Sequence, residues 1–297
     1  MAASDIFIAV DGGASGTRAR VTDGAGRALG VGEGGPGSLT LGIEQAWTGI
    51  RSAIAAALGE AGLPGDAAAA RHVFALAGSR HPRNIAAFHA ANPLGTPVTV
   101  MTDGYASLIG ALAGEPGSVV AVGTGVAGHR LFADGTSIAV DGWGFPAGDE
   151  GSGAWIGLEA ARLHLRAVDG RGPGDGVLAA ALANRLGREV GAIQDWLVGA
   201  PSTKYATLAP LVVDAAAAGD PMASDILDRA GEGLDRAVAG LDRDEPAPAL
   251  GLIGGLAGSL SGRLSEANRR RLVPARGTAL DGAVLVMTGA APEERIR

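Results

Sequence analysis

The chain contains no cysteine, and this absence excludes several kinds of site. It rules out disulfide bonds, a cysteine-based zinc site and an iron–sulfur cluster. Long apolar runs are missing too, since none reaches the roughly 18 residues of a membrane-spanning helix. No signal peptide precedes the first apolar segment, which begins at Ile6. We therefore expect a soluble cytoplasmic protein that binds no membrane.

Basic runs and aromatic side chains are scarce as well. The net charge is −7 and the longest basic run is Arg269-Arg270-Arg271, which argues against a nucleic-acid surface. An anionic nucleotide stays possible, because backbone amides and Mg²⁺ can hold phosphates. Only 4% of the residues are aromatic whereas 50 are glycine, which favours close packing of helices and strands. The length of 297 residues suggests about two domains.

The most informative stretch spans residues 6–20 and reads IFIAVDGGASGTRAR. An apolar run ends at Asp11, glycines follow, and alternation resumes at Arg18, which predicts a β-hairpin with a glycine-rich loop. Glycines let backbone N–H groups approach an anion closely, and a carboxylate at the strand end can hold Mg²⁺ through water. A plain hairpin turn is the alternative. The predicted phosphate-binding residues of this loop are Gly12, Gly13, Ser15, Gly16 and Thr17.

The same plan returns in the middle of the chain. An apolar strand over 118–122 enters a glycine-rich turn over 123–128, and a strand resumes over 129–132. The glycine spacing is that of a P-loop, but the lysine and hydroxyl residue of a P-loop are missing. The two loops begin about 112 residues apart, at Asp11 and Gly123. This spacing indicates two related halves.

Asp103 is the second informative carboxylate. It stands between an apolar strand predicted over 97–101 and a helix predicted over 105–113. Ligands of α/β sheets bind at the carboxyl ends of strands, where an aspartate can accept a proton from a substrate hydroxyl. The alternative is an N-cap of the helix, for which aspartate is among the best residues. The small residues Ala106, Gly110 and Ala113 permit another helix to cross closely.

Residues 141–157 form the most unusual segment, DGWGFPAGDEGSGAWIG. Two carboxylates stand among glycines just before a helix predicted over 152–168, and two tryptophans flank them. Carboxylates suit the hydroxyls of a polyol, which donate to them in paired hydrogen bonds, and aromatic rings suit the apolar face of a sugar. A capped helix start, with Ser152 or Asp149 as the cap, explains the glycines and tryptophans less well. The segment therefore predicts sugar binding.

Periodicity places the other elements. The first third reads β-β-β-α-β-α-β-α, with further elements over 28–32, 41–58, 72–77 and 83–90. After residue 177 we predict helices over 178–186, 189–197, 205–218 and 221–241, a strand over 250–253 and a glycine turn over 254–259. A short strand over 272–274, a final helix over 278–287 and a frayed tail after Gly289 end the chain.

In this order, the motifs D-G-G-x-S-G-T, T-D-G, G-T-G and G-G before a helix resemble those of the actin/Hsp70/sugar-kinase superfamily. Within it, WGFPAGDEGSG resembles the N-acetylglucosamine kinases, the bacterial glucosamine kinases and the BadF/BadG-type ATPases. The resemblance implies a two-lobed actin-like ATPase (ribonuclease H-like) fold with duplicated βββαβαβα domains and an inter-lobe cleft. The N-terminal lobe would span 1–113, completed by the helix 278–290. The second would span 117–277 and carry the sugar segment and a helical insertion.

The resemblance also implies roles for single residues. Asp103 would be the general base for a sugar 6-hydroxyl, and Asp11 would lie by Mg²⁺. ATP would be the co-substrate, an amino sugar the acceptor, and a homodimer the expected assembly. The remaining nucleotide-binding residues would be Gly123, Thr124, Gly125, Gly255 and Ser259. The substrate-binding residues would be Ser38, Asp103, Gly142, Trp143, Gly144, Asp149 and Glu150.

Three residues depart from the pattern of these families. Ala14 replaces a third glycine in the first loop, Val126 replaces a hydroxyl residue after the second, and Ser38 stands where an asparagine is usual. These changes bear more on the sugar than on the nucleotide, so glucosamine and N-acetylglucosamine are both open. Two other functions are weighed. A dehydratase-activating ATPase would need cluster-binding cysteines, and a sugar-sensing repressor would need a DNA-binding module before residue 6.

Overall fold

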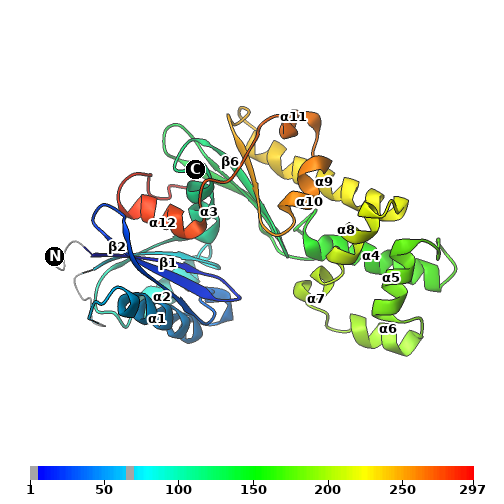
Figure 1. Ribbon diagram of the computed structural model, residues 1–297, viewed down its shortest axis with the longest axis horizontal. Helices are drawn as coiled ribbons and strands as arrows, with labels where there is room; N and C mark the ends of the chain where they lie inside the picture. The colour runs from blue at the N-terminus through cyan, green and yellow to red at the C-terminus, as the bar shows by residue number, and fades with distance from the viewer. Residues whose placement is uncertain (1–5, 65–69) are drawn as a thin grey trace. The chain divides into compact units, whose positions relative to one another are not determined.

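The structure is a computed structural model that describes residues 6–64 and 70–297 (Figure 1). Its residue contacts divide the chain into two compact units. The first comprises Met1–Val119, His129–Ile138 and Pro274–Arg297, and the second comprises Val120–Gly128 and Ala139–Val273. The lobe boundaries expected from the sequence, 1–113 with 278–290 and 117–277, stay a prediction. Residues 1–5 and 65–69 of the expected first lobe lie outside the described residues.

A five-stranded mixed sheet forms the centre of the first unit. Its order is β3-β2-β1-β4-β5, with β1 antiparallel to β2 and parallel to β4. The predicted hairpin is confirmed, because Asp11 pairs with Arg18 across β1 and β2. The strands are β1 (Ile6–Gly12), β2 (Thr17–Asp23), β3 (Ala28–Gly34), β4 (Arg71–Leu76) and β5 (Val98–Thr102).

Helices cover both faces of this sheet. In Figure 1, α1 and α2 lie on one face and α3 and α12 on the other. The aromatic centre of the first face is Trp47, which stacks on Phe88 with ring centroids 4.1 Å apart. The helical segments are η2 (Leu39–Leu41), α1 (Ile43–Glu60), α2 (Pro82–Ala90), α3 (Asp103–Leu112) and α12 (Ala279–Met287).

Alternating glycines explain why α1 lies directly on β3. Gly30, Gly32 and Gly34 share one face of the strand, because side chains alternate with a period of two. A methyl group at any of the three would lie 2.1 to 2.3 Å from a carbonyl oxygen of α1. Only glycine permits this approach, so the glycine-rich sequence fixes where the helix sits.

The second sheet repeats the first. Its order, β8-β7-β6-β9-β10, matches β3-β2-β1-β4-β5 strand for strand, which confirms the predicted duplication. β8 was not predicted, and β7 begins at Val126 rather than His129, so the glycine turn is only three residues long. The strands are β6 (Gly117–Val122), β7 (Val126–Leu131), β8 (Ser137–Asp141), β9 (Leu250–Ile253) and β10 (Leu272–Val273).

Between β8 and β10 the chain lies in the second unit and is mostly helical. The single helix predicted over 205–218 is wrong: the chain forms α7 and α8 with a break at Thr207–Leu208. Pro210 explains the break, because proline has no N–H to continue the helix and fits a first turn instead. The helices are α4 (Gly153–Val168), α5 (Val177–Leu186), α6 (Val190–Leu197), α7 (Ser202–Ala206), α8 (Ala209–Ala217), α9 (Pro221–Leu241), α10 (Ala257–Leu260), η3 (Ser261–Arg263) and α11 (Glu266–Arg269).

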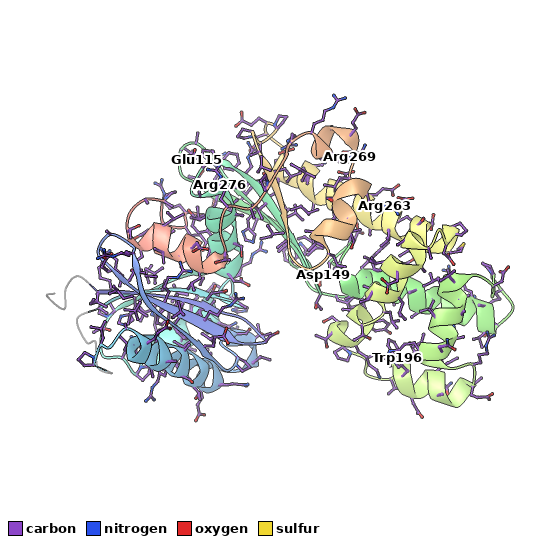
Figure 2. The ribbon with its side chains drawn as sticks, viewed as in Figure 1. Glu115, Asp149, Trp196, Arg263, Arg269 and Arg276 are labelled. Carbon is purple, nitrogen blue, oxygen red and sulfur yellow. The ribbon has the colours of Figure 1, made fainter. Side chains whose placement is uncertain are left out.

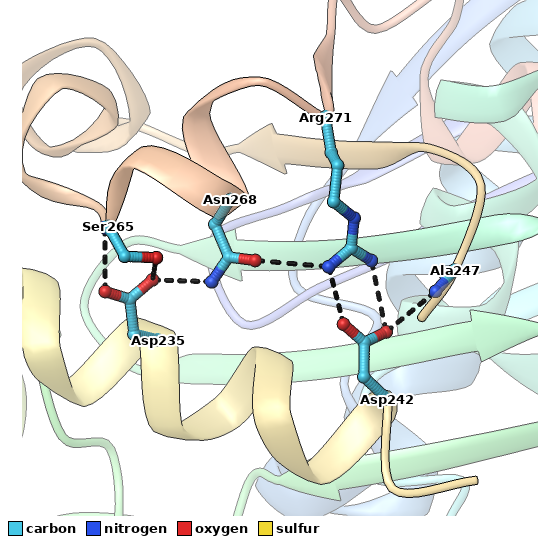
Figure 3. Close-up of polar contacts among 6 residues, drawn as sticks. All are labelled: Asp235, Asp242, Ala247, Ser265, Asn268 and Arg271. Carbon is cyan, nitrogen blue, oxygen red and sulfur yellow. Dashed lines mark hydrogen bonds and ion pairs between the residues drawn. The ribbon is translucent and has the colours of Figure 1, made fainter. Parts of the chain in front are cut away.

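A polar network fixes α11, which was not predicted, to the C-terminal half of α9 (Figure 3). Asp235 accepts hydrogen bonds from the backbone and hydroxyl of Ser265 and from the amide of Asn268. Asp242 pairs with Arg271 at 2.5 and 3.1 Å in a largely buried ion pair. Asp235 on α9 and Asp242 directly after it thus hold the connection between α10 and β10.

The C-terminal tail is ordered, so the predicted fraying after Gly289 is wrong. Ile296 forms a parallel bridge with Ser137 at the start of β8. Arg297 donates to Asp134 at 2.8 Å and lies over the ring of Phe132. Polar residues at a chain end suggest fraying, but here their partners are more than 150 positions away, which local sequence does not reveal.

None of the helices in the described part of the chain is long and apolar enough to span a membrane.

Candidate active site

The glycine-rich loop between β1 and β2 is held closed by its own backbone. The N–H of Gly13 donates to the carbonyl of Gly16 at 2.9 Å. Thr17 is 2% exposed, and its hydroxyl donates to the carbonyl of Gly35 at 2.7 Å. Gly37 packs against this pair, where a methyl group would lie 2.4 Å from the Thr17 hydroxyl oxygen. The hydroxyl of Thr17, predicted to donate to a phosphate, thus donates to the loop backbone in this structure. Ser15 is exposed at the tip of the loop.

A cleft of about 490 Å³ opens beside this loop. Asp11 and residues 13–18 line it together with Glu33 and Gly34. Burial raises the pKa of Asp11, the positive charge of Arg18 lowers it, and the carboxylate of Asp103 raises it. Arg18 was not predicted as a site residue. The hairpin register places it directly across from Asp11, so a predicted register could have identified this cation.

Asp103 is the first residue of α3, directly after β5. The cap of this helix is Thr102, whose hydroxyl oxygen accepts from the N–H of Tyr105 at 3.1 Å. The N-cap alternative for Asp103 is therefore excluded. Its side chain reaches solvent, yet the surrounding protein removes enough water to raise its pKa, against the lowering effect of the Gly104 N–H. An accessible carboxylate with a raised pKa suits a general base.

His129 lies against the start of α3, a contact that sequence reasoning missed. A methyl group at Gly104 would lie 2.0 Å from the Nε2 atom of His129. Burial and the positive charge of Arg80 lower the pKa of His129 to about 4. The imidazole is therefore neutral at pH 7, and it supports the turn that carries Asp103 without adding charge.

In the second unit, the loop Gly123–Thr124–Gly125 is tied to α4. The N–H of Gly153 donates to the carbonyl of Gly123 at 2.8 Å, and the N–H of Ala154 donates to that of Thr124 at 3.1 Å. Ser152 caps the helix by accepting from the N–H of Trp155. The first amides of α4 thus shape this loop, and Thr124 is exposed on it.

Asp149 connects the predicted sugar segment to the same loop. It lies near the N-terminal end of α4 (Figure 2) and is 8% exposed. Its carboxylate accepts from the N–H of Val126 at 3.1 Å, and a methyl group at Gly125 would lie 3.0 Å from both of its oxygens. Burial raises its pKa, as does the charge of Asp141, while the Val126 N–H lowers it.

We expect Asp149→Ala to destabilise the protein by about 2 to 3 kcal/mol. The change leaves the buried N–H of Val126 without its acceptor and puts alanine at a φ of 63°, which aspartate and asparagine tolerate better. Asp149→Asn keeps an acceptor oxygen, so its loss should stay below about 1 kcal/mol. Urea unfolding of both variants measures the difference, and equal losses would contradict this account of the loop.

The other predicted sugar residues occupy different environments. Trp143 is 80% exposed. Gly142 and Gly144 have φ values of 71° and 91°, which glycine adopts without strain. Glu150 forms an ion pair with Arg236 of α9 at 2.9 Å.

Ser38 belongs to the first unit and is 2% exposed. It caps η2, and its hydroxyl bonds to Thr40 at 2.8 Å. This gives Ser38 a structural task, so its predicted role toward a sugar stays a prediction.

The glycine turn after β9 meets the second loop. A methyl group at Gly254 would lie 2.3 Å from the carbonyl oxygen of Val122, and the N–H of Leu256 donates to that same carbonyl. Gly255 is exposed, with open space where a side chain would stand, and Ser259 follows on α10. The structure therefore gathers the second loop, Asp149 and this turn within one unit.

The first unit likewise gathers Asp11, the hairpin loop and Asp103. Within residues 6–64 and 70–297 there is no cluster of three or more histidine or carboxylate side chains that could hold a metal ion by itself. A cation at Asp11 would therefore depend on water and on the ligand's own oxygens, as Mg²⁺ does in phosphoryl-transfer sites.

Comparison with known families agrees with this arrangement. The sequence pattern of the BadF/BadG/BcrA/BcrD ATPase family matches residues 8–285, nearly the whole chain. The chain belongs to this family. This BadF/BadG/BcrA/BcrD family member is 30% identical, over 281 residues and 94% of each chain, to the glucosamine kinase GspK of Vibrio cholerae.

Solved structures extend the comparison. A candidate N-acetylglucosamine kinase from Chromobacterium violaceum is 37% identical and superimposes with a TM-score of 0.88, covering 96% of this chain and 99% of the other. A ROK family glucokinase from Streptomyces griseus, solved with glucose and AMPPNP, is 18% identical, with a TM-score of 0.55 over 94% and 97% of the two chains. The second likeness concerns the fold alone, and it confirms the predicted actin-like α/β fold.

Proposed function

We propose that this protein transfers the γ-phosphate of ATP to the 6-hydroxyl of an amino sugar, glucosamine or N-acetylglucosamine. The observation that carries the proposal is the placement of Asp103. Asp103 follows β5, its side chain reaches solvent and its pKa is raised. Thr102 caps α3, so the Asp103 carboxylate is not used as the helix cap. The similarity to a glucosamine kinase and a candidate N-acetylglucosamine kinase supports the choice of acceptor.

The chemistry asks little of the protein beyond orientation and charge. Asp103 would accept the proton of the sugar 6-hydroxyl as that oxygen bonds to the γ-phosphorus, and the bond to the β-phosphate oxygen would break to release ADP. Backbone N–H groups of the hairpin loop and the Ser15 hydroxyl would hold the transferred group, with Arg18 supplying positive charge at the same cleft. The carboxylates at this cleft would otherwise repel the nucleotide.

A magnesium ion fits this cleft, because Asp11 supplies a carboxylate oxygen, the donor type that Mg²⁺ prefers. Asp11 would hold the ion through water. When bound, Mg²⁺ would neutralise phosphate charge.

Residues of the second unit would bind the rest of the nucleotide and the sugar. Gly123, Thr124 and Gly125 would contact the ATP phosphates, and Gly255 with Ser259 would lie near the adenosine. The sugar-binding residues would be Ser38 of the first unit and Gly142, Trp143, Gly144, Asp149 and Glu150 of the second. Asp149 would act from a fixed position. Its carboxylate accepts from the N–H of Val126, and its own backbone N–H donates to the carboxylate of Asp141. The cytoplasmic location and the homodimer remain expectations.

ADP release with Mg²⁺-ATP against a sugar panel tests the proposal. The panel comprises glucosamine, N-acetylglucosamine, glucose, N-acetylmannosamine and a reaction without sugar. We expect turnover with one of the two amino sugars at least about tenfold above the others, since a missing or extra polar group costs a buried site at least that much. Phosphorus NMR of the product identifies the phosphorylated hydroxyl.

ADP release that does not depend on sugar would overturn the kinase proposal and point to an ATPase. Binding of sugar without turnover would point to a sensor that acts through a protein partner.

A further inference from the structure

Glu294 is a half-buried carboxylate in the C-terminal tail that the proposed chemistry does not use. One of its oxygens accepts from the N–H of Thr102 at 2.8 Å, and the other accepts from the Thr102 hydroxyl at 2.7 Å. The partners are 192 positions apart in the chain. Thr102 is the residue that directly precedes Asp103, so Glu294 bonds the last residue before the proposed general base.

The chemistry of this contact calls for a carboxylate. The Thr102 oxygen already accepts from the N–H of Tyr105, so its hydroxyl hydrogen must find an acceptor elsewhere. The Thr102 N–H needs a second acceptor at the same point. A carboxylate offers two acceptor oxygens, whereas a glutamine side chain offers one acceptor and one donor.

The tail is anchored on both sides of Glu294. Before it, the carbonyl of Pro292 accepts from the hydroxyl of Tyr105 at 2.9 Å. After it, Arg295 donates to the carbonyl of Asp134 at 3.0 Å. The tail backbone around Glu294 is therefore held on one side by Tyr105 of α3 and on the other by the turn at Asp134.

Placing the Glu294 carboxylate near the Asp103 carboxylate is electrostatically unfavourable, which a purely structural contact would not require. Burial raises the pKa of Glu294, and so does the charge of Asp103, while the two bonds from Thr102 and the charge of Arg80 lower it. Other titratable groups also lie near this turn. Asp11 on β1 interacts electrostatically with Asp103, and His129 on β7 is neutral. Tyr105 on α3 has its pKa raised to about 12 by burial and by the charge of Glu294, while Arg295 in the tail lowers it. An uncharged tail residue would avoid setting two carboxylates close together.

We propose that Glu294 is a positioning residue: by fixing both polar groups of Thr102, it sets the first turn of α3 and thus the direction of the Asp103 carboxylate. This inference rests on the proposed function, because it assigns Glu294 to the orientation of the general base. It predicts that a tail residue controls the rate of phosphoryl transfer without contacting either substrate.

The test compares Glu294→Ala, Glu294→Gln and the matched control Glu293→Ala, which changes an exposed glutamate in the same tail. We expect kcat to fall about 10- to 100-fold in Glu294→Ala, since small misplacements of a catalytic group have effects of this size. The KM values for sugar and ATP should stay within about threefold, because neither substrate loses a contact. Glu294→Gln should keep part of the rate, because one acceptor remains.

Hydrogen exchange gives a readout that does not depend on activity. Amides of residues 102–106 should exchange faster in Glu294→Ala than in the wild type, and should not change in Glu293→Ala. Unchanged exchange, or an unchanged kcat with faster exchange, would overturn the positioning role. A rise in the KM for sugar or ATP as large as the fall in kcat would assign Glu294 to substrate binding instead. A loss of folded protein in circular dichroism that accounts for the whole fall in kcat would assign it to stability alone.

An inactive wild-type enzyme would be a failure of the proposed function, and it would overturn the catalytic part of this inference with it. The exchange data would then decide whether Glu294 fixes the turn.

Discussion

Replacing Asp103 by asparagine should lower kcat by about 10²- to 10⁴-fold, the range that a general base contributes. Asparagine keeps the size and the hydrogen-bonding reach of the side chain but cannot accept the hydroxyl proton. The KM values for ATP and sugar should change little, because the lost interaction develops only in the transition state. Steady-state ADP release measures both quantities. Asp175→Asn, at an exposed position of the second unit, is the control.

The same substitution should leave the protein at least as stable as the wild type. The pKa of Asp103 is raised in the folded state, so the stability that the carboxyl contributes is present below its unfolded pKa and is lost as the pH rises through the folded pKa. At pH 7 the charged carboxylate is therefore a cost that asparagine removes. Thermal unfolding of Asp103→Asn at pH 7 should show an equal or higher Tm.

The pH dependence of the wild-type enzyme should agree. Activity should fall as the pH drops through the raised pKa of Asp103, at a higher pH than an ordinary aspartate would give. Asp11 and Glu294 also titrate above their ordinary range, whereas His129 stays neutral above about pH 4. Retention of most of the wild-type kcat in Asp103→Asn would refute the general-base assignment, whatever the stability result.

Gly282→Ala should be among the most destabilising single substitutions in this chain, with a loss of about 4 kcal/mol or more in the free energy of unfolding. The new methyl group would lie 2.0 Å from the carbonyl oxygen of Ala106 and 2.7 Å from the backbone nitrogen of Gly110. Both contacts are with backbone of α3, which cannot rotate away as a side chain can. The two helices would have to separate, and α12 would lose its packing against β1 and β4.

Urea unfolding followed by circular dichroism measures this loss. Gly59→Ala is the matched control, because Gly59 lies in α1 with open space around it. Alanine is the better helix former there, so the control should gain up to about 1 kcal/mol. A loss below about 1 kcal/mol in Gly282→Ala would show that the α3–α12 crossing relaxes easily and that its glycines are dispensable.

The crossing of α3 and α12 also shows how far sequence patterns reach. The sequence predicted two helices with small residues, and both exist at nearly the expected positions. Gly110 on the first helix was named from the sequence, but Gly282 on the second was not. The closest approach is made by these two glycines, where each backbone meets the other. Periodicity identifies a face, but which residue on that face touches depends on the crossing point, and that is a property of two packed helices.

The candidate site also has parts that local sequence patterns reveal and parts that depend on the tertiary structure. The hairpin loop, Asp103 after β5 and the segment around Asp149 were found in the sequence because each is a local pattern of glycines and carboxylates at a strand or helix end. The N-cap alternative for Asp103 was settled only by the position of Thr102. The contacts of Asp149 with Val126, of His129 with Gly104 and of Glu294 with Thr102 join segments far apart in sequence, so no local signal pointed to them.

The sequence by itself determined most of the secondary-structure elements, their order and most of the chemical groups of the site, because propensity, periodicity and glycine placement act over a few residues. It did not reveal β8, α11 or the break between α7 and α8. The tertiary structure alone decided how those groups are held. The buried N–H and hydroxyl groups at Val126 and Thr102 must find acceptors, and the fold meets this need with carboxylates that the chain brings from 23 and 192 positions away. Such pairings follow from the assembled sheets and packed helices, which no single stretch of residues encodes.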